Sequence, residues 1–454
     1  MSRSSIAIVG GGASGTLAAI HLLRLARSSG TPVAVTLIDR YGRHAAGQAY
    51  ATTDPGHLLN TRAAQMSAID GEPGHLVDWA RAQGLDPDGF LPRAAYGRYL
   101  RETLAAAEDP PDRTLHRVTA TAAALDAEPG TAPAVRLADG RRVAADAVVL
   151  ALGNRAPAPL PGVPGHPRHV ADPWAGDALA AIDDGAPVLV VGTGLTMVDV
   201  ALTVTRAHPG TVVHALSRHA LLPRPHRAVP AAPFPVRLPD DGPLRVAGLL
   251  AAVRRAVREN GGEWHGVVDG LRPHIPALWR RLDLDQRRLF LRRVARYWEI
   301  HRHRMPPAAV AAIADLREQG RLRLLRGRLL AAEPVAVGLR ARAELDGTVT
   351  ELDVGWIVNA TGPGCDVTAD PFTAGLIDAG TARPDPLRLG LDVAADGAVL
   401  DAAGRPHDRL FALGPLLRGV HFETTAVPEI RAQAAALAPR LLAIARSRAA
   451  QPAA

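Results

Sequence analysis

The chain has 454 residues, a formal net charge of +7 and a hydrophobic fraction of 47%, so it is long enough for two or three domains with real cores. All of its 52 basic residues are arginine. The absence of lysine excludes a Walker A loop and any Schiff-base or pyridoxal-phosphate chemistry, because each requires a lysine. The arginines are spread along the chain and aromatic residues make up 4%, so we predict a solvated basic surface and no nucleic-acid partner.

Cys365 is the one cysteine in the sequence, which excludes a disulfide framework, a C-x-x-C redox pair and a cysteine-based metal site. We expect Cys365 to be a small buried residue, and we predict no metal site. The first predicted strand begins at Ile6, and no apolar run approaches the length of a membrane span. We therefore expect no signal peptide, no membrane association and a cytoplasmic location.

A glycine-rich turn follows the strand predicted at residues 6–9. Gly10, Gly12 and Gly15 form G-x-G-x-x-G, with Ala13 and Ser14 in between, and an Ala/Leu-rich helix follows. In this order a strand, turn and helix form the fingerprint of a dinucleotide-binding unit. The first glycine permits a tight turn, the second admits a pyrophosphate, and the third lets the helix pack close to the strand. The helix N-terminus offers N–H groups and a positive dipole end to the phosphates.

The strand predicted at residues 33–38 ends in Asp39. A carboxylate at this position binds both ribose hydroxyls of an adenosine and repels a 2′-phosphate. The first unit is therefore predicted to bind FAD or NAD rather than NADP. The alternative is a glycine-rich turn without a ligand.

The same pattern recurs after the strand at residues 187–191. Gly192, Thr193 and Gly194 repeat the first part of the turn, whereas Met197 replaces the third glycine. The next strand, residues 211–216, is followed by Ser217 and Arg218, whose guanidinium suits a 2′-phosphate. This unit is predicted to bind NADPH, and the alternative is a Rossmann-like unit that binds nothing.

Residues 154–167 are rich in proline and glycine and are predicted to link two domains. Residues 240–320 are predicted to be helical. Strands resume at residues 322–362 and end in Gly362, and a late strand ends in Gly414 before a final helix from about Pro428. The start of that helix, near Thr425, is expected to point at a flavin ring.

Arg302, His303 and Arg304 form a basic cluster before Pro306 and Pro307. One interpretation is a pocket for an anionic substrate or a phosphate, and the other is neutralisation of the negative end of a helix. We hypothesise a pocket on the substrate or nicotinamide side, because three adjacent cationic or titratable groups repel one another unless an anion lies among them.

The predicted fold is α/β, a flavoprotein with two dinucleotide-binding domains of Rossmann-like type. Residues 1–160 and 363–446 are predicted to form a discontinuous FAD-binding domain. Residues 186–362 are predicted to form an NADPH-binding domain that carries the helical insert of about 240–320. Residues 447–454 are expected to be a mobile tail.

Several motifs carry a resemblance to a known family: IVGGGASG, HLLN, FLPRAAYGRYL, VVGTGLTMVDVAL, LSRHALLPR, HRHRMPP, IVNATGP and FALGPLLRGVHFETTAVPEIR. They resemble the bacterial FAD/NAD(P)-binding proteins that include FAD-dependent urate hydroxylases and aspartate N-monooxygenases. More distantly they are similar to lysine and ornithine N-hydroxylases of the class B flavin monooxygenases. The resemblance implies that Asn60 and Arg93 lie beside the flavin. The predicted cofactor-binding residues are Gly10, Gly12, Ala13, Ser14, Gly15, Asp39, Asn60, Arg93, Gly192, Thr193, Gly194, Arg218, Gly362, Gly414 and Thr425.

The function predicted from these features is an FAD-dependent, NADPH-using monooxygenase. It would hydroxylate a small molecule at nitrogen or at an electron-rich carbon through a flavin C4a-hydroperoxide, with dioxygen as the second substrate. One alternative is an NADPH-dependent reductase that passes electrons to a protein or a quinone. Another is a non-catalytic FAD-binding redox module. No catalytic side chain and no substrate identity follow from the sequence.

Gly12→Val tests the first glycine turn. The valine side chain would occupy the path of the pyrophosphate, so the purified variant should lose its flavin absorbance. A folded variant that keeps its full flavin content would show that the assignment is wrong.

Overall fold

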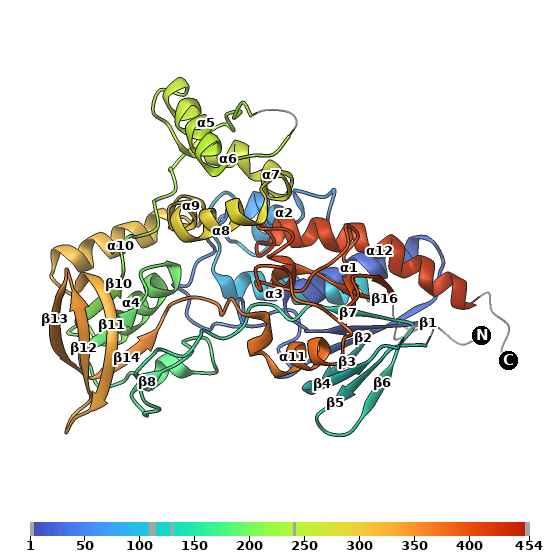
Figure 1. The fold of residues 1–454 in the computed structure, drawn as a ribbon, viewed down its shortest axis with the longest axis horizontal. Coiled ribbons are helices and arrows are strands. Elements are labelled where there is room, and N and C mark those ends of the chain that lie inside the picture. The colour runs from blue at the N-terminus through green and yellow to red at the C-terminus, as the bar shows by residue number, and fades with distance from the viewer. Residues whose placement is uncertain (1–3, 109–114, 129–130, 239–241, 450–454) are drawn as a thin grey trace.

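The structure is a computed structural model that describes residues 4–108, 115–128, 131–238 and 242–449. Figure 1 shows two large sheets side by side, with helices above them and α5, α6 and α7 projecting furthest from the sheets. The first sheet has the strand order β15-β16-β7-β1-β2-β3, and the second has the order β13-β12-β11-β10-β9-β14-β8. The predicted α/β fold with two Rossmann-like units is confirmed.

Strands from both ends of the chain build the first sheet. Its strands are β1 (Ser4–Val9), β2 (Val33–Asp39), β3 (Leu115–Thr119), β7 (Ala147–Leu150), β15 (Ala398–Leu400) and β16 (Pro406–Ala412). β1 pairs in parallel with β2 and β7, and β16 pairs in parallel with β7. The late strand therefore returns to the first unit, as the sequence predicts.

Alternating residues of β1 contact two different layers. Ile6 and Ile8 pack with residues of α1 (Ala13–Ser28), α3 (Arg93–Ala107) and α12 (Val427–Ala449). Ala7 and Val9 face the other way and pack with residues of a three-stranded sheet of β4 (Ala122–Asp126), β5 (Ala134–Leu137) and β6 (Arg142–Ala144). Because both faces of the parallel sheet are covered, residues 6–9 of β1 form an uninterrupted apolar run rather than an alternating one.

The second sheet repeats this plan. Its strands are β8 (His169–Val170), β9 (Val188–Val191), β10 (Val213–Ser217), β11 (Leu322–Pro334), β12 (Leu339–Leu345), β13 (Thr348–Val354) and β14 (Trp356–Asn359). β9 lies between β10 and β14 with parallel pairing on both sides. Val188 and Val190 pack with residues of α4 (Leu195–Ala207) and α10 (Pro307–Glu318), whereas Leu189 packs with residues of β12.

The predicted helical insert lies between β10 and β11. It contains α5 (Val246–Glu259), α6 (His265–Leu271), α7 (Ile275–Arg281), α8 (Leu284–Arg293) and α9 (Ala295–Arg302), followed by α10. The insert has its own apolar cluster, which includes Trp279 and Phe290 and is completed by Phe422 from the first unit. The Trp279 and Phe422 rings stack at 4.6 Å, and Trp279 Nε1 donates to the carbonyl of Gly419 at 2.8 Å. The insert is therefore packed onto the segment that precedes α12.

The remaining elements are short. They are α2 (His75–Ala82), α11 (Pro371–Asp378) and the 3₁₀ turns Ala63–Gln65, Ala178–Ala181, Arg272–His274, Val367–Ala369 and Gly414–Leu417. No helix or strand lies within residues 154–167. None of the helices in the described part of the chain is long and apolar enough to cross a membrane.

The expectation about Cys365 is wrong. Cys365 is exposed rather than buried, because it lies in the loop between β14 and α11 and not on a core-facing element. Residues 447–449 of the expected mobile tail continue α12, and the mobility of the tail stays a prediction. Residues 450–454 lie outside the described residues.

The two glycine turns have the same backbone conformation for the same reason. Gly10 has φ +109° and Gly192 has φ +120°, both in the region that L side chains rarely adopt. A Cβ at Gly10 would lie 2.2 Å from the carbonyl oxygen of Ala151, and one at Gly192 would lie 2.1 Å from that of Ala360. Each turn therefore passes directly against the end of the neighbouring parallel strand.

Gly192→Ala should lower the free energy of unfolding by at least about 1–3 kcal/mol, which is the cost of a strained backbone conformation. Gly210→Ala is the matched control, because its Cβ would meet nothing within 4 Å and its φ is not in the strained range. Urea denaturation of both variants measures the difference. Equal stability of the two variants would contradict the strain argument.

Candidate functional site

The first glycine turn leaves the N-terminus of α1 free for a ligand. The N-cap residue Gly12 has no side-chain hydrogen bond to the helix, and the first turn contains no acidic residue. A Cβ on Gly15 would lie 2.0 Å from the carbonyl oxygen of Gly10, so only glycine allows this approach of helix and strand. Around Gly12 the nearest atom is the Cα of Gly47, at 3.5 Å from an added Cβ. The uncapped N–H groups and the positive end of the helix fit a pyrophosphate.

Asp39 lies at the end of β2 beside this turn. Its Oδ1 accepts hydrogen bonds from the N–H groups of Tyr41 and Arg43, each at 3.0 Å. No residue in the described part of the chain donates a hydrogen bond to Oδ2. One oxygen therefore shapes the turn after β2, and the other is left for a ribose hydroxyl.

His44 was not identified from the sequence and lies against the same carboxylate. Both of its ring nitrogens are buried without a hydrogen-bond partner in the described structure, and Nδ1 would lie 2.8 Å from a Cβ on Gly11. Burial lowers the pKa of His44, although Asp39 acts in the opposite direction. Two buried ring nitrogens without partners are costly, and a hydrogen-bonding ligand at this turn would satisfy them. The residues present therefore fit a dinucleotide.

The second turn has the same form. The N-cap of α4 is Gly194, again without a side-chain cap and without an acid in the first turn. Thr193 Oγ1 lies 2.9 Å from Ser217 Oγ and donates to the carbonyl of Leu221 at 2.6 Å. Thr193 thus ties the turn to the loop that follows β10. Met197 is fully buried in the core of this unit rather than at the turn.

Arg218 is exposed in that loop. The pKa of the neighbouring His219 is lowered by burial and then by the positive charges of Arg296, Arg218 and Arg326. Positive charge therefore gathers beside the second turn, where a 2′-phosphate would lie if NADPH binds there.

The late strand completes the first site. A Cβ on Gly414 would lie 2.7 Å from Ser14 Oγ, so this residue lies against the first turn of α1. The Gly414 N–H donates to Gln433 Oε1 at 2.9 Å, and Thr424 Oγ1 donates to the Gly414 carbonyl at 2.9 Å. The buried Thr424 hydroxyl therefore orders this segment. Thr425, which was predicted to bind the cofactor, is exposed. Gly362 follows β14 and has a positive φ of 87°. In the first unit Gly153 follows β7 in the same way and has a positive φ of 70°.

Asn60 and Arg93 lie where the two units meet. Both line a small cavity together with Leu58 of the first unit and with Leu195 and Asp199 of α4. The Arg93 guanidinium also lies over the ring of Trp174, 5.4 Å from its centroid. The cavity is bounded on one side by the beginning of the helix that follows the second glycine turn, so it lies between the two units.

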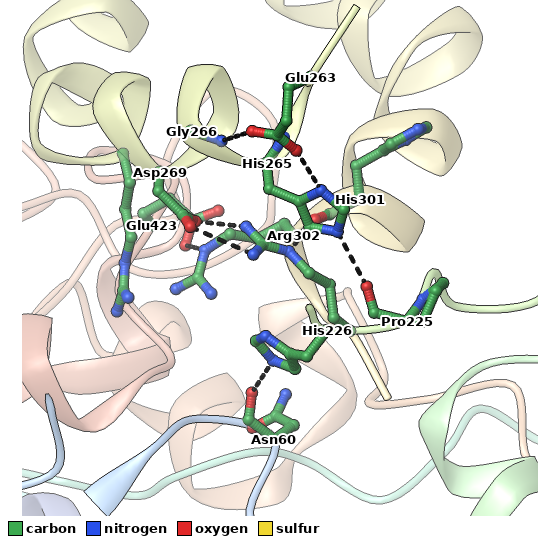
Figure 2. A network of polar contacts seen from close by, with 12 residues as sticks. Asn60, Pro225, His226, Glu263, His265, Gly266, Asp269, His301, Arg302 and Glu423 are labelled. Atoms are coloured by element: carbon green, nitrogen blue, oxygen red, sulfur yellow. Dashed lines mark hydrogen bonds and ion pairs between the residues drawn. The ribbon is translucent and has the colours of Figure 1, made fainter. Parts of the chain in front are cut away.

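The basic cluster is paired with protein carboxylates, and Figure 2 shows Arg302 beside Glu423. Arg302 Nε donates to Glu423 Oε2 at 3.2 Å, with both side chains 6% exposed. His303 Nε2 lies 3.0 Å from Glu299 Oε2, and Arg304 forms an ion pair with Asp269. The argument that repulsion within the cluster requires a bound anion therefore fails, because three carboxylates of the chain supply the opposite charge. A substrate-binding role of these residues stays a prediction.

Glu423 and Glu429 bind the insert to the first unit. Trp298 Nε1 donates to Glu423 Oε1 at 2.8 Å, and Arg272 binds both carboxylate oxygens of Glu429 at 2.6 and 2.9 Å. Burial alone would raise the pKa of Glu429, but Arg272 and Arg302 outweigh it and lower the pKa. These ion pairs hold the N-terminal part of α12 and the segment before it, which are predicted to lie beside the flavin.

His226 connects the insert to the loop of Asn60 (Figure 2). Its Nε2 lies 2.9 Å from the Asn60 carbonyl oxygen, which only accepts, so Nε2 carries the proton. Burial is the largest influence and lowers the pKa of His226 to about 4, assisted by Arg304 and Arg62 and opposed by the Asn60 hydrogen bond. The imidazole is therefore neutral at pH 7. Sequence reasoning missed His226 because nothing in the spacing of its segment pairs it with residue 60.

No group of three or more His, Cys, Asp or Glu side chains that could hold a metal ion occurs in the described part of the chain. The two sites offer backbone N–H groups, one acidic residue and one arginine, which is a donor set for dinucleotides.

Residues 7–155 match the FAD-NAD(P)-binding family. The match covers the first glycine turn, Asp39, Asn60 and Arg93, and it confirms the resemblance inferred from the motifs. The predicted cofactor class, FAD with a nicotinamide dinucleotide, agrees with this family.

Two curated relatives are L-aspartate N-monooxygenases that form nitrosuccinate. The one from Streptomyces cremeus is 34% identical over 246 residues, which cover 43% of this chain and 36% of the relative. The one from Streptomyces davaonensis is 29% identical over 273 residues, covering 49% of this chain and 42% of the relative. The chain thus matches less than half of the length of either relative.

Solved structures of amine hydroxylases share the fold over nearly the whole chain. L-lysine 6-monooxygenase from Pseudomonas syringae has a TM-score of 0.67 at 17% identity, with 99% of this chain and 100% of that chain covered. Ornithine N-hydroxylase from Kutzneria sp. 744 has a TM-score of 0.66 at 16% identity, with 98% and 100% covered. At this identity the likeness concerns the fold.

Arg302→Ala should lower the free energy of unfolding by about 3–5 kcal/mol, because it leaves Glu423 buried without its charge partner. Arg288→Ala is the control: its side chain is 57% exposed in an ion pair with Asp285, so a change within about 0.5 kcal/mol is expected. Urea denaturation compares the two. Parent-like stability of Arg302→Ala would show that the pair does not stabilise the fold.

Proposed function

We propose that the chain is an FAD- and NADPH-dependent monooxygenase that hydroxylates an amino nitrogen of a small molecule. The observation that carries this proposal is the presence of two uncapped glycine turns, one in each unit, in a chain whose partial relatives are aspartate N-monooxygenases. The fold shared with lysine and ornithine hydroxylases supports the same reaction class.

The residues of this chain would bind and orient both cofactors. The first turn and Asp39 would hold the pyrophosphate and a ribose of FAD, and the second turn with Arg218 would hold those of NADPH. Gly414 and the hydrogen bonds of Thr424 would fix the segment beside the flavin. When bound, the flavin supplies the two-electron chemistry that reduces dioxygen, which no side chain of this chain could supply.

The overall reaction balances with these partners. The reduced nicotinamide and one proton provide two electrons and two hydrogens. One oxygen atom of dioxygen enters the substrate as a hydroxyl on nitrogen, and the other leaves as water. The substrate nitrogen must carry a lone pair to react, so the enclosed site has to exclude water and keep the amine neutral.

A reductase is the second candidate, and one observation favours it. Thioredoxin reductase from T. acidophilum also shares the fold, with a TM-score of 0.52 at 11% identity. The single cysteine excludes disulfide exchange by a C-x-x-C pair, which leaves electron transfer to a protein or a quinone. A non-catalytic redox module would bind FAD without oxidising NADPH.

The purified protein decides among these functions. We expect bound FAD, NADPH oxidation and oxygen consumption that rise together with a suitable amine, tested with L-aspartate, L-ornithine and L-lysine, and a hydroxylamine or more oxidised nitrogen product by mass spectrometry. Reduction of an artificial acceptor, with only hydrogen peroxide formed from dioxygen for every amine, would favour the reductase. Gly12→Val is the matched control without flavin.

Arg218→Ala should weaken NADPH binding by about 1.5–3 kcal/mol, because one charge-assisted contact with the 2′-phosphate is lost. NADH binding should change little, since NADH has no such phosphate. Arg405→Ala, whose side chain is 75% exposed in the first unit, controls for the change in net charge. Equal rates of flavin reduction by both nucleotides in the parent protein would contradict the assignment.

A further inference from the structure

One face of α4 carries polar residues in an otherwise apolar helix. Asp199, Thr203 and Arg206 are spaced by four and three residues, so they share one side of the helix. The opposite side, which includes Met197, Val200 and Val204, is buried in the core of the second unit. The polar face lies against residues 52–58 and Arg93 of the first unit, as its contacts show.

Asp199 forms an ion pair across the two units. Arg93 Nη2 lies 2.7 Å from Asp199 Oδ2, with the side chains 17% and 9% exposed. Arg93 Nε donates to the carbonyl of Leu58 at 3.1 Å, and the Arg93 N–H donates to the carbonyl of His57 at 2.8 Å. The guanidinium is thus fixed between α4 and the loop that leads to Asn60.

A second set of contacts lies one turn further along α4. Thr203 Oγ1 donates to Asp54 Oδ2 at 2.6 Å and lies 2.9 Å from His57 Nε2. His57 Nδ1 lies 2.7 Å from Thr52 Oγ1, and Arg206 pairs with Asp54 at 2.5 Å. We call Asp199, Thr203 and Arg206 with their partners Arg93, His57 and Asp54 the α4 contact.

The α4 contact joins the two predicted cofactor sites. α4 begins at Leu195, directly after the second glycine turn, and Arg93 begins α3 in the first unit. Leu195, Asp199, Arg93 and Asn60 line one cavity. Any shift of α4 relative to the first unit would therefore move the second glycine turn relative to the loop of Asn60.

We infer that Asp199 is a positioning residue for electron transfer between the two cofactors: through its ion pair with Arg93 it fixes the second glycine turn relative to the flavin side of the first unit. The inference rests on the proposed function. The step affected is transfer of a hydride, one proton with two electrons, from the reduced nicotinamide, which is oxidised, to the flavin, which is reduced. Asp199 forms and breaks no covalent bond in that step.

The burial of Asp199 makes it suited to this role. Burial raises the pKa of Asp199, and the charges of Arg93 and His57 oppose this effect. A buried carboxylate depends strongly on its partner, so the ion pair specifies one arrangement of the two units more than it stabilises either of them. Because hydride transfer depends steeply on the distance between donor and acceptor, a small displacement lowers its rate.

Anaerobic stopped-flow measurement of flavin reduction by NADPH tests the inference. Asp199→Asn should keep its FAD and lower the limiting rate at saturating NADPH at least tenfold, and Asp199→Glu should recover part of the rate. Asp184→Asn is the control, because its ion pair with Arg168 lies within the second unit, and its rate should stay within twofold of the parent. In an Arg93→Gln background, Asp199→Asn should cause no further loss, since the two side chains act as one pair.

A limiting rate of Asp199→Asn within twofold of the parent would overturn the inference, even if the melting temperature falls. A residue with a merely structural role would change only the amount of folded protein and not the rate of the folded enzyme. Should Asp199→Asn fail to fold, Arg93→Gln breaks the same ion pair from its other side. An unchanged rate in that variant would then overturn the inference. A parent protein that binds FAD but is not reduced by NADPH would refute the proposed function itself.

Discussion

The structure depends on one constraint that occurs twice: a parallel strand must end in a glycine so that the chain can turn against the neighbouring strand and start a helix. At Gly10 and Gly192 the carbonyl oxygens of Ala151 and Ala360 leave no space for a Cβ. The helix that follows each turn then begins without a side-chain cap. Both helices therefore offer free N–H groups and a positive end at the same edge of their sheets, which is what a dinucleotide phosphate requires.

Charge organises the junction between the units. Arginine is the only strongly basic residue type in the chain, and its planar fork suits paired, bidentate contacts with carboxylates. Arg93 with Asp199 joins the two units, while Arg302 with Glu423 and Arg272 with Glu429 join the insert to the beginning of α12. Each pair lies at a boundary rather than within a core, so these pairs determine how the parts are oriented more than whether each part folds.

Local sequence patterns predicted the features that depend on neighbouring residues. The two glycine turns, the acid at the end of β2, the arginine after β10, the helical insert and the return of the late strand to the first unit all follow from periodicity and spacing. Errors arose where a contact between distant segments decides the outcome. Cys365 was expected to be buried because small apolar residues usually are, yet it lies in an exposed loop. The argument that repulsion at the basic cluster of Arg302 requires an anion failed because Glu423, Asp269 and Glu299 are not recognisable as its partners from the sequence, whereas the substrate-binding role itself stays a prediction.

The sequence by itself determined that the chain forms two strand-glycine-helix units and which of them has an acidic residue at the end of its second strand, because these features involve backbone conformation and residues close in the chain. Only the tertiary structure decided which charges meet. An acidic residue within a mostly apolar helix, such as Asp199, is unusual and can be noticed in the sequence. Its partner Arg93 cannot be recognised there, because it lies more than a hundred residues away along the chain. His44, likewise, becomes notable only when its ring nitrogens are found buried without partners beside Asp39. Electrostatic pairing and desolvation depend on distances through space, and those distances exist only in the folded chain.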